Sequence, residues 1–541
     1  MHQRAATAAG TGTRPLRRAA WLAGLVAGLA GLAVANLAAW LMGPVGAPVS
    51  AVGELVIDLL PAPLVNFGKD TLGTADKPVL VAIITVAVLV VCALAGQAEL
   101  RRRFGGAALL AVVAVLGLVG VAARAGSDPM VYLPTIVGLA LGYLLLRVMV
   151  DRLEAWRDAA APEQSAAEQS GSGQSGAGQS GSGQPASPER RGFLRLTLVV
   201  GGLAAVGAVV GEVLLGAAGR VNEARLRLRL PGAARSAATV PAAADLGVPG
   251  LAPYITPNAD FYRIDTALQV PAIDPDDWSL TITGMVEQEV TLSYAELAAL
   301  PLVEHVATLT CVSNEVGGGL VGNAVWLGYP IRELLARARP TAGADMVLST
   351  SEDGFTAGTP LDALTDPGRE SLLAIGMNGE PLPLEHGFPV RMVVPGLYGY
   401  VSATKWVTEL KVTTFEADYG YWTPLGWAER GPIKLASRID VPRRGVDAGQ
   451  VAVAGVAWAQ HTGIAAVEVQ VDGGAWQRAE LAETTGPDTW RQWRYLWDAP
   501  SGDHTLTVRA TDAAGTVQDA AEAPPAPDGS SGYHQLSVTV R

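Results

Sequence analysis

The chain has 541 residues, of which 49% are hydrophobic and 17% charged, and it carries a formal net charge of −12. This length allows several domains, and the acidic balance argues against a nucleic-acid partner, because phosphate binding needs clustered cations. There are two cysteines, and Cys92 lies in an apolar segment where Cys311 of the polar half could not reach it, which excludes a disulfide framework.

Apolar segments dominate the first 220 residues. A lipid-spanning helix needs about 20 mostly apolar residues, because each residue rises about 1.5 Å. The stretch 52–67 is apolar but holds two carboxylates and two prolines, which indicates an interfacial loop helix. Five other stretches have the required length and, apart from Glu212 in the last one, no charged residue; they are 19–42, 78–96, 104–123, 129–146 and 196–217. We therefore predict a five-span region in the lipid bilayer.

Arginine groups lie on one side of these predicted spans, at 14–18, 101–103, 147–157 and 190–195. Because cationic loops stay in the cytoplasm, this pattern predicts a cytoplasmic amino terminus, five spans and a carboxy-terminal half on the extracytoplasmic side. None of the six histidines lies in a span, so no haem held by two histidines is expected within the membrane.

A low-complexity segment at 159–189 contains repeats of the type GSGQ and is expected to be a flexible linker. It separates a four-span membrane region, 1–158, from a segment at 190–220 that holds the fifth span. The latter begins with RRGFLR, which resembles a twin-arginine export signal. The alternative is that these arginines only provide the inward-facing charge of the fifth span.

The polar half begins with an expected connector at 221–250. Strands and helices then mix without regular alternation over 251–438, which favours an α+β domain. Ser293 with Glu296 forms a capping signal for a short helix, and the strand-like run 306–311 ends at Cys311. Short strands separated by turn signals fill 439–541 and predict an immunoglobulin-like β-sandwich. Trp458 and Trp476 are expected in the core of that sandwich.

The polar half contains several ordered motifs: NADFYR at 258–263, TLTCVSNE at 308–315, GYPIRELL at 328–335, HGFPVRMVVPGLYG at 386–399 and the pair Lys405-Trp406. Together these motifs resemble those of the sulfite oxidase family of molybdopterin enzymes. The similarity covers about 250–541, and the predicted sandwich resembles the family's carboxy-terminal domain.

The resemblance implies a molybdenum cofactor with one pterin, bound to the protein through the thiolate of Cys311. A thiolate is a soft ligand that suits a transition metal. Cys311 and Arg391 are the implied catalytic residues. Phosphate binding favours guanidinium and ammonium groups, and the implied cofactor-binding residues are Tyr262, Arg263, Ser351, His386, Arg391, Thr404 and Lys405.

Two departures from the family pattern bear on the substrate. Animal sulfite oxidases carry two arginines after Cys-x-x-Asn, where this chain has Glu315 and Val316. Losing two cations should weaken the binding of a sulfite dianion. Spacing from Trp422 puts Trp427 at the position of the family's active-site tyrosine, and tryptophan has no ionisable hydroxyl.

The sequence therefore indicates a membrane-anchored molybdopterin oxidoreductase that carries out two-electron or oxygen-atom transfer on a small, sulfur-containing substrate, in either the oxidising or the reducing direction. It would need a separate electron carrier, and the sandwich could mediate homodimerisation. One alternative is a cofactor-free envelope-binding protein with a relic oxidoreductase domain. Another is that the spans form a transport or quinone-contact module, although they contain no histidine and almost no charge to support ion transport.

Overall fold

The computed structural model describes residues 13–42, 48–60, 71, 76–124, 129–170, 188–215, 217–267, 270–443 and 445–541. The chain divides into two compact units, Met1–Ala217 and Ala218–Arg541. Most of the expected linker, from 171 to 187, lies outside the described residues. Its first residues, up to Ser170, are helical and continue the preceding helix.

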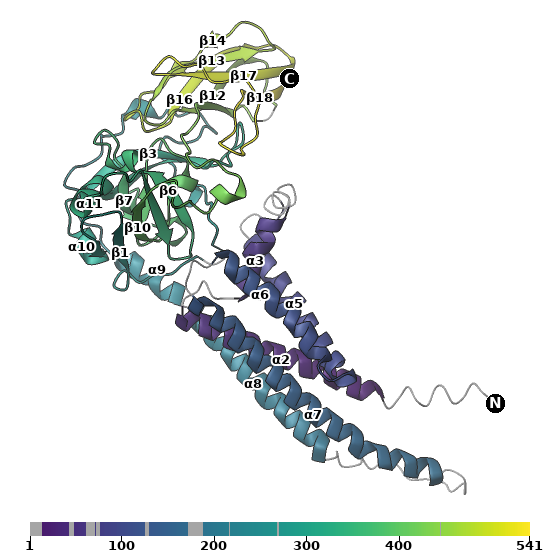
Figure 1. Cartoon of the computed structure of the whole chain (residues 1–541). Coiled ribbons are helices and arrows are strands. Elements are labelled where there is room, and N and C mark those ends of the chain that lie inside the picture. The colour runs from purple at the N-terminus through teal and green to yellow at the C-terminus, as the bar shows by residue number, and fades with distance from the viewer. Residues whose placement is uncertain are drawn as a thin grey trace. The chain divides into compact units, whose positions relative to one another are not determined.

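The first unit is helical (Figure 1). Its helices are α2 (Thr13–Met42), α3 (Pro48–Leu59), α5 (Asp76–Arg101), α6 (Gly105–Arg124), the 3-10 turn η3 (Pro129–Tyr132), α7 (Leu133–Ser170) and α8 (Pro188–Leu215). Among the described residues, four segments are long and apolar enough to cross a membrane: Leu16–Ala39, Val79–Arg101, Gly105–Ala122 and Met130–Asp158. They correspond to the first four predicted spans.

Small residues allow α2 to pack closely against α5 and α7. A Cβ atom at Gly28 would lie 2.6 Å from the Cys92 sulfur, and one at Gly31 would lie 2.6 Å from Gly138 O. Both distances are shorter than van der Waals contact, so only glycine fits at these positions. Such close backbone approach is how apolar helices associate in lipid, where the hydrophobic effect gives no driving force between them.

One buried carboxylate joins three helices of this unit. Glu99, near the end of α5, accepts hydrogen bonds from Phe104 N at 3.2 Å and Gly106 N at 2.8 Å, at the start of α6. It also pairs with Arg147 of α7, with 3.1 Å between Nη1 and Oε1. Glu99 therefore satisfies the open N–H groups of the α6 terminus and fixes the α5–α6 hairpin to α7.

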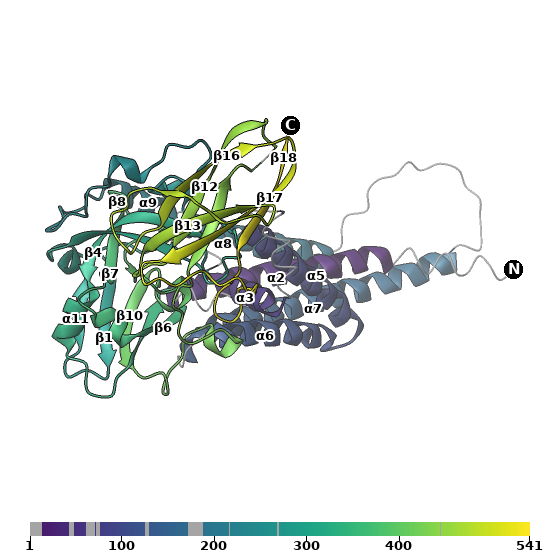
Figure 2. The same ribbon diagram turned by 90° about the horizontal axis from the view of Figure 1, so that it is seen from above.

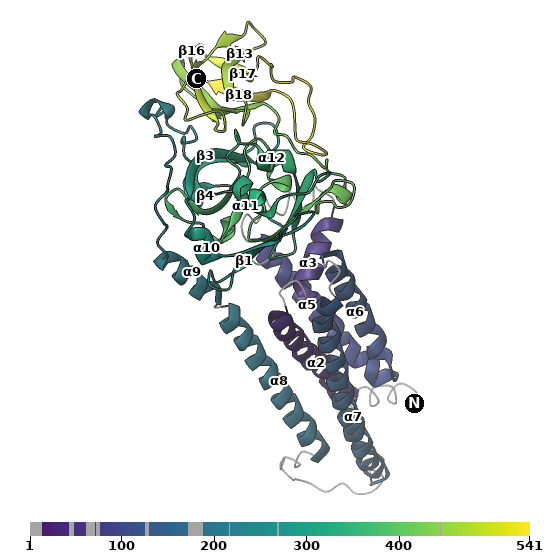
Figure 3. The same ribbon diagram turned by 60° about the vertical axis from the view of Figure 1, so that its left-hand side comes forward.

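The second unit begins with α9 (Ala217–Arg227) and continues through two sheets. One has the strand order β2 (Val290–Ser293), β1 (Ser279–Gly284), β10 (Val407–Thr413), β5 (Met346–Ser351), β6 (Thr356–Pro360). The other has the order β3 (Val303–Thr310), β4 (Val321–Pro330), β7 (Leu372–Met377), β8 (Glu380–Pro381), with β9 (Arg391–Val393) also paired to β7. Figure 3 shows these sheets beside the short helices α10 (Tyr294–Ala298), α11 (Ile331–Ala338) and α12 (Leu361–Thr365). The mixture agrees with the predicted α+β character.

The expected connector packs on this domain. Val221, Leu228 and Leu230 contribute to its two apolar cores, and Arg225 donates to Pro381 O at 3.1 Å. The short 3-10 turns of the second unit are η4 (Ala242–Ala244), η5 (Asn258–Asp260), η6 (Leu384–His386), η7 (Gly399–Val401) and η8 (Thr423–Leu425).

The carboxy-terminal region contains two four-stranded sheets that enclose one core (Figure 2). The first has the order β11 (Ala436–Val441), β12 (Gly449–Trp458), β16 (Arg491–Ala499), β15 (Glu480–Leu481). The second has the order β14 (Gln477–Arg478), β13 (Ile464–Val471), β17 (Gly502–Asp512), β18 (His534–Val540). Trp493 and Trp497 from one sheet pack with Leu506 and Val508 from the other.

Two tryptophans are not where the sequence placed them. Trp458 is buried, but it packs with Tyr254, Val321 and Trp490 in a separate cluster where the sandwich meets the α+β domain. Trp476 is half-buried and its ring lies 4.2 Å from the Arg509 guanidinium. For Trp458, alternation in a strand identifies two faces without indicating which one is internal. Trp476 lies in the turn between β13 and β14, where alternation gives no indication of burial.

The predicted capping box offers a stability test. Ser293 Oγ accepts from Glu296 N at 3.3 Å, and Glu296 Oε2 accepts from Ser293 N at 2.9 Å. We expect Ser293→Ala to lower the free energy of unfolding of this unit by about 1 kcal/mol, because an N–H of α10 loses its acceptor. Urea titration followed by tryptophan fluorescence measures this change. Ser293→Thr keeps the acceptor and should be close to wild type; equal destabilisation by both variants would contradict the assignment.

Candidate active site

Cys311 lies directly after the end of β3, in a turn closed by its own backbone and by Asn314. Cys311 N donates to Leu320 O at 3.0 Å, and Asn314 N donates to Cys311 O at 3.1 Å. Asn314 Oδ1 accepts from Leu320 N at 2.7 Å. Cys311 is 7% exposed. These bonds hold the thiol in a fixed place at the end of the strand, as the run 306–311 predicted.

Two tyrosines and Arg391 share the surroundings of Cys311. Burial raises the pKa of Tyr262, the negative charge of a Cys311 thiolate adds to this rise, and Arg391 opposes it. Burial also raises the pKa of Tyr398 to about 12, with Cys311 as a smaller cause. A Cβ atom at Gly399 would lie 4.0 Å from the Tyr262 hydroxyl and 3.9 Å from the last carbonyl of β3. The Tyr262 hydroxyl and the backbone that precedes the thiol therefore both lie close to Gly399.

Arg391, the first residue of β9, is a buried guanidinium. It donates to His386 O at 3.1 Å, to Ala403 O at 3.4 Å and to Met392 O at 3.3 Å. It forms no ion pair with any described carboxylate within 4.0 Å, and it is 4% exposed. Burial lowers its pKa to about 10. Desolvating a charge without a counter-charge is costly, so this position suits an arginine that meets an anion.

Lys405 and Arg263 share one carboxylate, that of Asp265. Asp265 Oδ2 lies 3.0 Å from Lys405 Nζ and 3.0 Å from Arg263 Nε. Lys405 also donates to Glu385 O at 2.8 Å. The pKa of Lys405 is lowered to about 8; burial is the main cause, Asp265 opposes it, and the charges of Arg391 and Arg263 add to the lowering. Two cations therefore share one carboxylate, and Arg391 is a third positive charge near Lys405, so the cluster has an excess of positive charge.

His386, at the end of η6, is a neutral member of the cluster. Burial is the main cause that lowers its pKa to about 3, and Lys405 and Arg391 add to the effect. Its Nε2 lies 3.2 Å from Asn258 O, a contact that favours a proton on Nε2. Its buried Nδ1 has no hydrogen-bond partner.

Two hydroxyls complete the predicted set. Ser351, the last residue of β5, is 4% exposed and its Oγ has no partner. Thr404 is buried, and its Oγ1 lies 2.7 Å from Ser349 Oγ. The structure thus brings together Arg263, His386, Arg391 and Lys405 by direct contact or charge, and Cys311 with Tyr262. No contact joins Ser351 or Thr404 to these cations.

An anionic, hydrogen-bonding cofactor fits this site. The site has a guanidinium without a described carboxylate partner at Arg391, two cations that share the single carboxylate of Asp265, and orphaned polar atoms at Ser351 Oγ and His386 Nδ1. Buried polar atoms in native proteins nearly always have a partner. A phosphorylated pterin would supply acceptors and negative charge for these groups, and the Cys311 thiol would supply the soft metal ligand.

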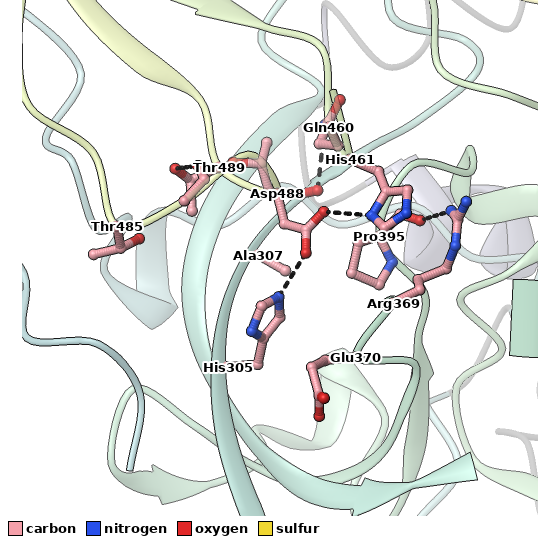
Figure 4. A network of polar contacts seen from close by, with 12 residues as sticks. His305, Ala307, Arg369, Glu370, Pro395, Gln460, His461, Thr485, Asp488 and Thr489 are labelled. Atoms are coloured by element: carbon pink, nitrogen blue, oxygen red, sulfur yellow. Dashed lines mark hydrogen bonds and ion pairs between the residues drawn. The ribbon is translucent and has the colours of Figure 1, made fainter. Parts of the chain in front are cut away.

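Loops of the sandwich bind the free edge of β3 (Figure 4). Asp488 O accepts from Thr308 N at 2.9 Å, and Thr308 Oγ1 accepts from Trp490 N at 2.8 Å. Gln460 Nε2 donates to Thr308 O at 3.2 Å and to Thr310 Oγ1 at 2.9 Å. The strand that ends at Cys311 is therefore paired on this edge by another domain.

Two histidines hold Asp488 in place (Figure 4). Its carboxylate lies 2.8 Å from His305 Nε2 and 3.2 Å from His461 Nδ1. His305 belongs to β3 itself, whereas His461 follows β12, so the carboxylate joins the two domains. The backbone of Gly396 packs against His461, since a Cβ atom added at Gly396 would lie 3.2 Å from His461 Cβ.

Sequence reasoning missed Asp265 and Tyr398. Asp265 comes two residues after Arg263 and contacts Lys405, 140 positions later in the chain, so local spacing gave no signal. Tyr398 lies inside the motif 386–399 but was not distinguished from its neighbours. Trp427, which spacing put at the position of the family's active-site tyrosine, has its ring 6.0 Å from the Tyr400 ring and 6.1 Å from the Trp422 ring. The tyrosine hydroxyls that are electrostatically coupled to Cys311 belong to Tyr262 and Tyr398.

The lowered pKa of Lys405 predicts how anion binding depends on pH. We expect the cofactor-free chain to bind sulfate with constant affinity at pH 6–7, because Lys405 is then charged. Above its pKa of about 8 the ammonium loses its proton, and affinity should fall by up to about tenfold per pH unit. Calorimetric titration checks this. The fall should vanish in Lys405→Gln and persist in Lys411→Gln, a half-exposed lysine paired with Asp418; a flat wild-type profile would contradict it.

The hydrogen bonds that Gln460 donates to β3 predict a change in amide hydrogen exchange. Gln460→Leu removes two hydrogen bonds to the strand, so amides of 306–312 should exchange at least several-fold faster, as expected where local opening becomes easier. Mass spectrometry of peptic peptides measures this. Gln470→Leu is the control, because Gln470 only donates to Gly474 O within an exposed turn. Equal exchange of 306–312 in both variants would mean that Gln460 does not hold the strand.

Comparisons with known proteins agree with this geometry. A family model described as an oxidoreductase molybdopterin binding domain matches residues 267–422. Mitochondrial sulfite oxidase of Rattus norvegicus is 32% identical over 321 residues, which cover 50% of this chain and 58% of that protein. Sulfite oxidase of Arabidopsis thaliana is 29% identical over 329 residues, 49% of this chain and 82% of that protein.

Two further similarities extend the comparison. The oxidoreductase YuiH of Bacillus subtilis is 35% identical over 158 residues, which cover 29% of this chain and 76% of YuiH. The sulfane dehydrogenase SoxCD of Paracoccus pantotrophus aligns in structure with a TM-score of 0.46 and 24% identity, over 53% of this chain and 81% of that one. The match spans a little under six tenths of the rat protein's length. The chain is an oxidoreductase, and it belongs to the sulfite oxidase family of molybdopterin-dependent enzymes.

Proposed function

We propose that this protein is a membrane-anchored molybdopterin oxidoreductase that acts on a small, sulfur-containing substrate. The observation that carries the proposal is the buried guanidinium of Arg391, which has no carboxylate partner within 4.0 Å among the described residues and is electrostatically coupled to Tyr262, beside Cys311. A relic site would gain nothing from keeping such a group, because an uncompensated buried charge lowers stability.

In this proposal each residue of the site has a role of its own. Cys311 supplies the protein's thiolate ligand to molybdenum. Arg391, Lys405 and Arg263 hold the negative charge of the pterin, while Tyr262, Ser351, His386 and Thr404 provide hydrogen bonds to it. When bound, the metal–pterin group would supply the two-electron or oxygen-atom-transfer chemistry. Asp265 keeps Lys405 and Arg263 oriented, and the sandwich loops keep β3 and its thiol in place.

The residues after Cys311 bear on the substrate. Glu315 is exposed, and its carbonyl accepts from Gly318 N at 2.9 Å in the turn that follows the thiol. A carboxylate in that turn repels a dianion, so we propose a sulfur compound with less negative charge than sulfite. Oxidation of a sulfur compound and reduction of a sulfoxide both remain consistent with these residues.

The cellular setting forms part of the same proposal. The arginine groups favour a cytoplasmic amino terminus and catalytic domains on the extracytoplasmic side, and α8 would be the fifth span, in addition to the four candidate segments. The segment 190–195 would act as a twin-arginine signal. The α+β domain, 251–438, would hold the cofactor, the immunoglobulin-like sandwich, 439–541, would mediate a homodimer, and a separate carrier would exchange electrons with the site.

Cofactor content tests this function directly. The full chain, produced in a host that makes the cofactor, should contain about one molybdenum and one pterin per chain, measured by elemental analysis and by fluorescence of the oxidised pterin. Arg391→Met and Lys405→Met should lower both contents at least tenfold, because the anion loses its counter-charge. Cys311→Ser should keep the pterin but lose one metal–sulfur interaction in the X-ray absorption spectrum.

Lys434→Met is the matched control. Lys434 is a partly exposed lysine whose ammonium pairs with Asp528 at 2.9 Å, whereas the ammonium of Lys405 pairs with Asp265. It should retain wild-type cofactor. A well-folded wild-type chain without molybdenum, or full loading of Arg391→Met, would overturn the proposed roles.

A further inference from the structure

The turn that follows Cys311 is rich in glycine. Positions 317–319 are all glycine, the residue that loses the most conformational freedom on folding. Gly318 N donates to Glu315 O at 2.9 Å, which closes the part of the turn that carries the exposed Glu315 carboxylate. Because the glycines favour many conformations, contacts from outside the turn are needed to keep this carboxylate in one place.

Arg438 of β11 contacts the turn from the carboxy-terminal region. Its Nη1 donates to Gly318 O at 2.9 Å. Its other donors bind one carboxylate, with Nε 2.7 Å from Asp440 Oδ1 and Nη2 3.4 Å from Asp440 Oδ2. A guanidinium is planar and presents its donors in a rigid fork, so the position of Asp440 determines where Gly318 is held.

The Arg438–Asp440 pair acts through its position rather than through its charge. The two side chains are 8% and 0% exposed, and their opposite charges cancel at a distance. Asp440 Oδ2 also accepts from Ala252 N at 3.1 Å. A buried ion pair is weak evidence for stability, because the cost of desolvation offsets the attraction. What the pair does in this structure is fix Gly318, the residue that closes the turn on Glu315.

Two further contacts hold the same turn. Ser530 Oγ donates to Asn314 O at 2.7 Å. The His534 ring packs so closely on the backbone of Gly317 that a Cβ atom there would not fit. Burial is the main cause that lowers the pKa of His534, so the ring is neutral at neutral pH and adds no charge to the turn.

We propose that Arg438 is a positioning residue that fixes the Glu315 carboxylate in the turn after Cys311, and so determines how strongly the site excludes dianions. The link is a pair of bonds, from the guanidinium to Gly318 and from there to Glu315 O. The inference rests on the proposed function, in which Glu315 repels doubly charged substrates, and it makes a residue of the carboxy-terminal region part of that selectivity. Without the guanidinium, the glycine turn is released and the carboxylate moves toward water, where it keeps its hydration.

Alkylation of Cys311 tests the position of this charge without the cofactor. The full chain, made in a host that lacks the cofactor and kept in nonionic detergent, is treated separately with iodoacetate, an anion, and with iodoacetamide, its neutral analogue. Mass spectrometry of the Cys311 peptide gives the ratio of the neutral to the anionic rate. Accessibility and thiolate content affect both reagents alike, so the ratio measures the local charge. Glu315→Gln should lower this ratio at least about twofold at about 10 mM salt and change it little at about 1 M salt, where charges are screened.

A double variant separates the position of Glu315 from folding. Arg438→Met with Asp440→Asn removes the bond to Gly318 without leaving a buried unpaired charge, and the new amide oxygen still accepts from Ala252 N. We expect it to lower the ratio to about the value of Glu315→Gln. Adding Glu315→Gln to it should cause no further decrease, because Arg438 acts through Glu315. Arg438→Lys keeps the charge but replaces three nitrogens by one, so it should also lower the ratio.

Arg494→Met with Glu480→Gln is the matched control. Arg494 pairs with Glu480 at 2.7 Å between β16 and β15, in the sheet that contains β11. This variant therefore also removes one ion pair from that sheet, and its ratio should match that of wild type.

Three results would overturn the positioning role. They are a wild-type ratio in both Arg438 variants, no effect of Glu315→Gln, and an equal decrease in the control. Molybdenum content is measured in parallel on chains from a host that makes the cofactor. A wild-type chain without molybdenum but with the expected alkylation ratios would reject only the proposed cofactor roles, whereas full molybdenum with unchanged ratios would reject only the role of Arg438.

Discussion

The second unit depends on burying more positive than negative charge in one place. Lys405 and Arg263 share the carboxylate of Asp265, Arg391 has no described carboxylate partner, and burial lowers the pKa values of both Arg391 and Lys405. Such a cluster persists only if the surrounding backbone supplies acceptors. It does so through the carbonyls of His386, Met392 and Ala403 around Arg391 and of Glu385 beside Lys405. The backbone of η6, of β9 and of the segment before β10 therefore supplies the acceptors that these cations require.

The thiol side of the site has a different support. β3 is the outer strand of its sheet, and exposed strand edges are prone to pair with other chains. Here the loops of the sandwich occupy that edge through Gln460, Asp488 and Trp490. The same loops that cover the edge also hold the last residues of β3, and so they help to fix the position of Cys311. This gives the sandwich a structural role in the site that does not depend on dimerisation.

Local sequence signals anticipated much of this architecture, and non-local contacts limited it. The strand before Cys311, the Ser293 cap and the first four spans each follow from a pattern within one segment. Arg263, Arg391 and Lys405 were predicted only from motifs that resemble the sulfite oxidase family. Nothing in the local sequence around an isolated arginine such as Arg391 indicates that it binds a cofactor. Asp265 was missed because its partner Lys405 is 140 residues away. Trp458 was assigned to the wrong core because strand alternation identifies two faces but not which neighbour each one meets.

The contact between Glu99 and Arg147 has a consequence for biosynthesis. The two residues are 48 positions apart, so at about 5–20 residues per second the ribosome adds Arg147 several seconds after Glu99. During that interval the carboxylate has only the backbone N–H groups of the α5–α6 turn as partners. The α5–α6 hairpin can form at once, but its attachment to the rest of the bundle must wait for α7. The helical unit would thus assemble in two steps, and the order of those steps is determined by the order of synthesis.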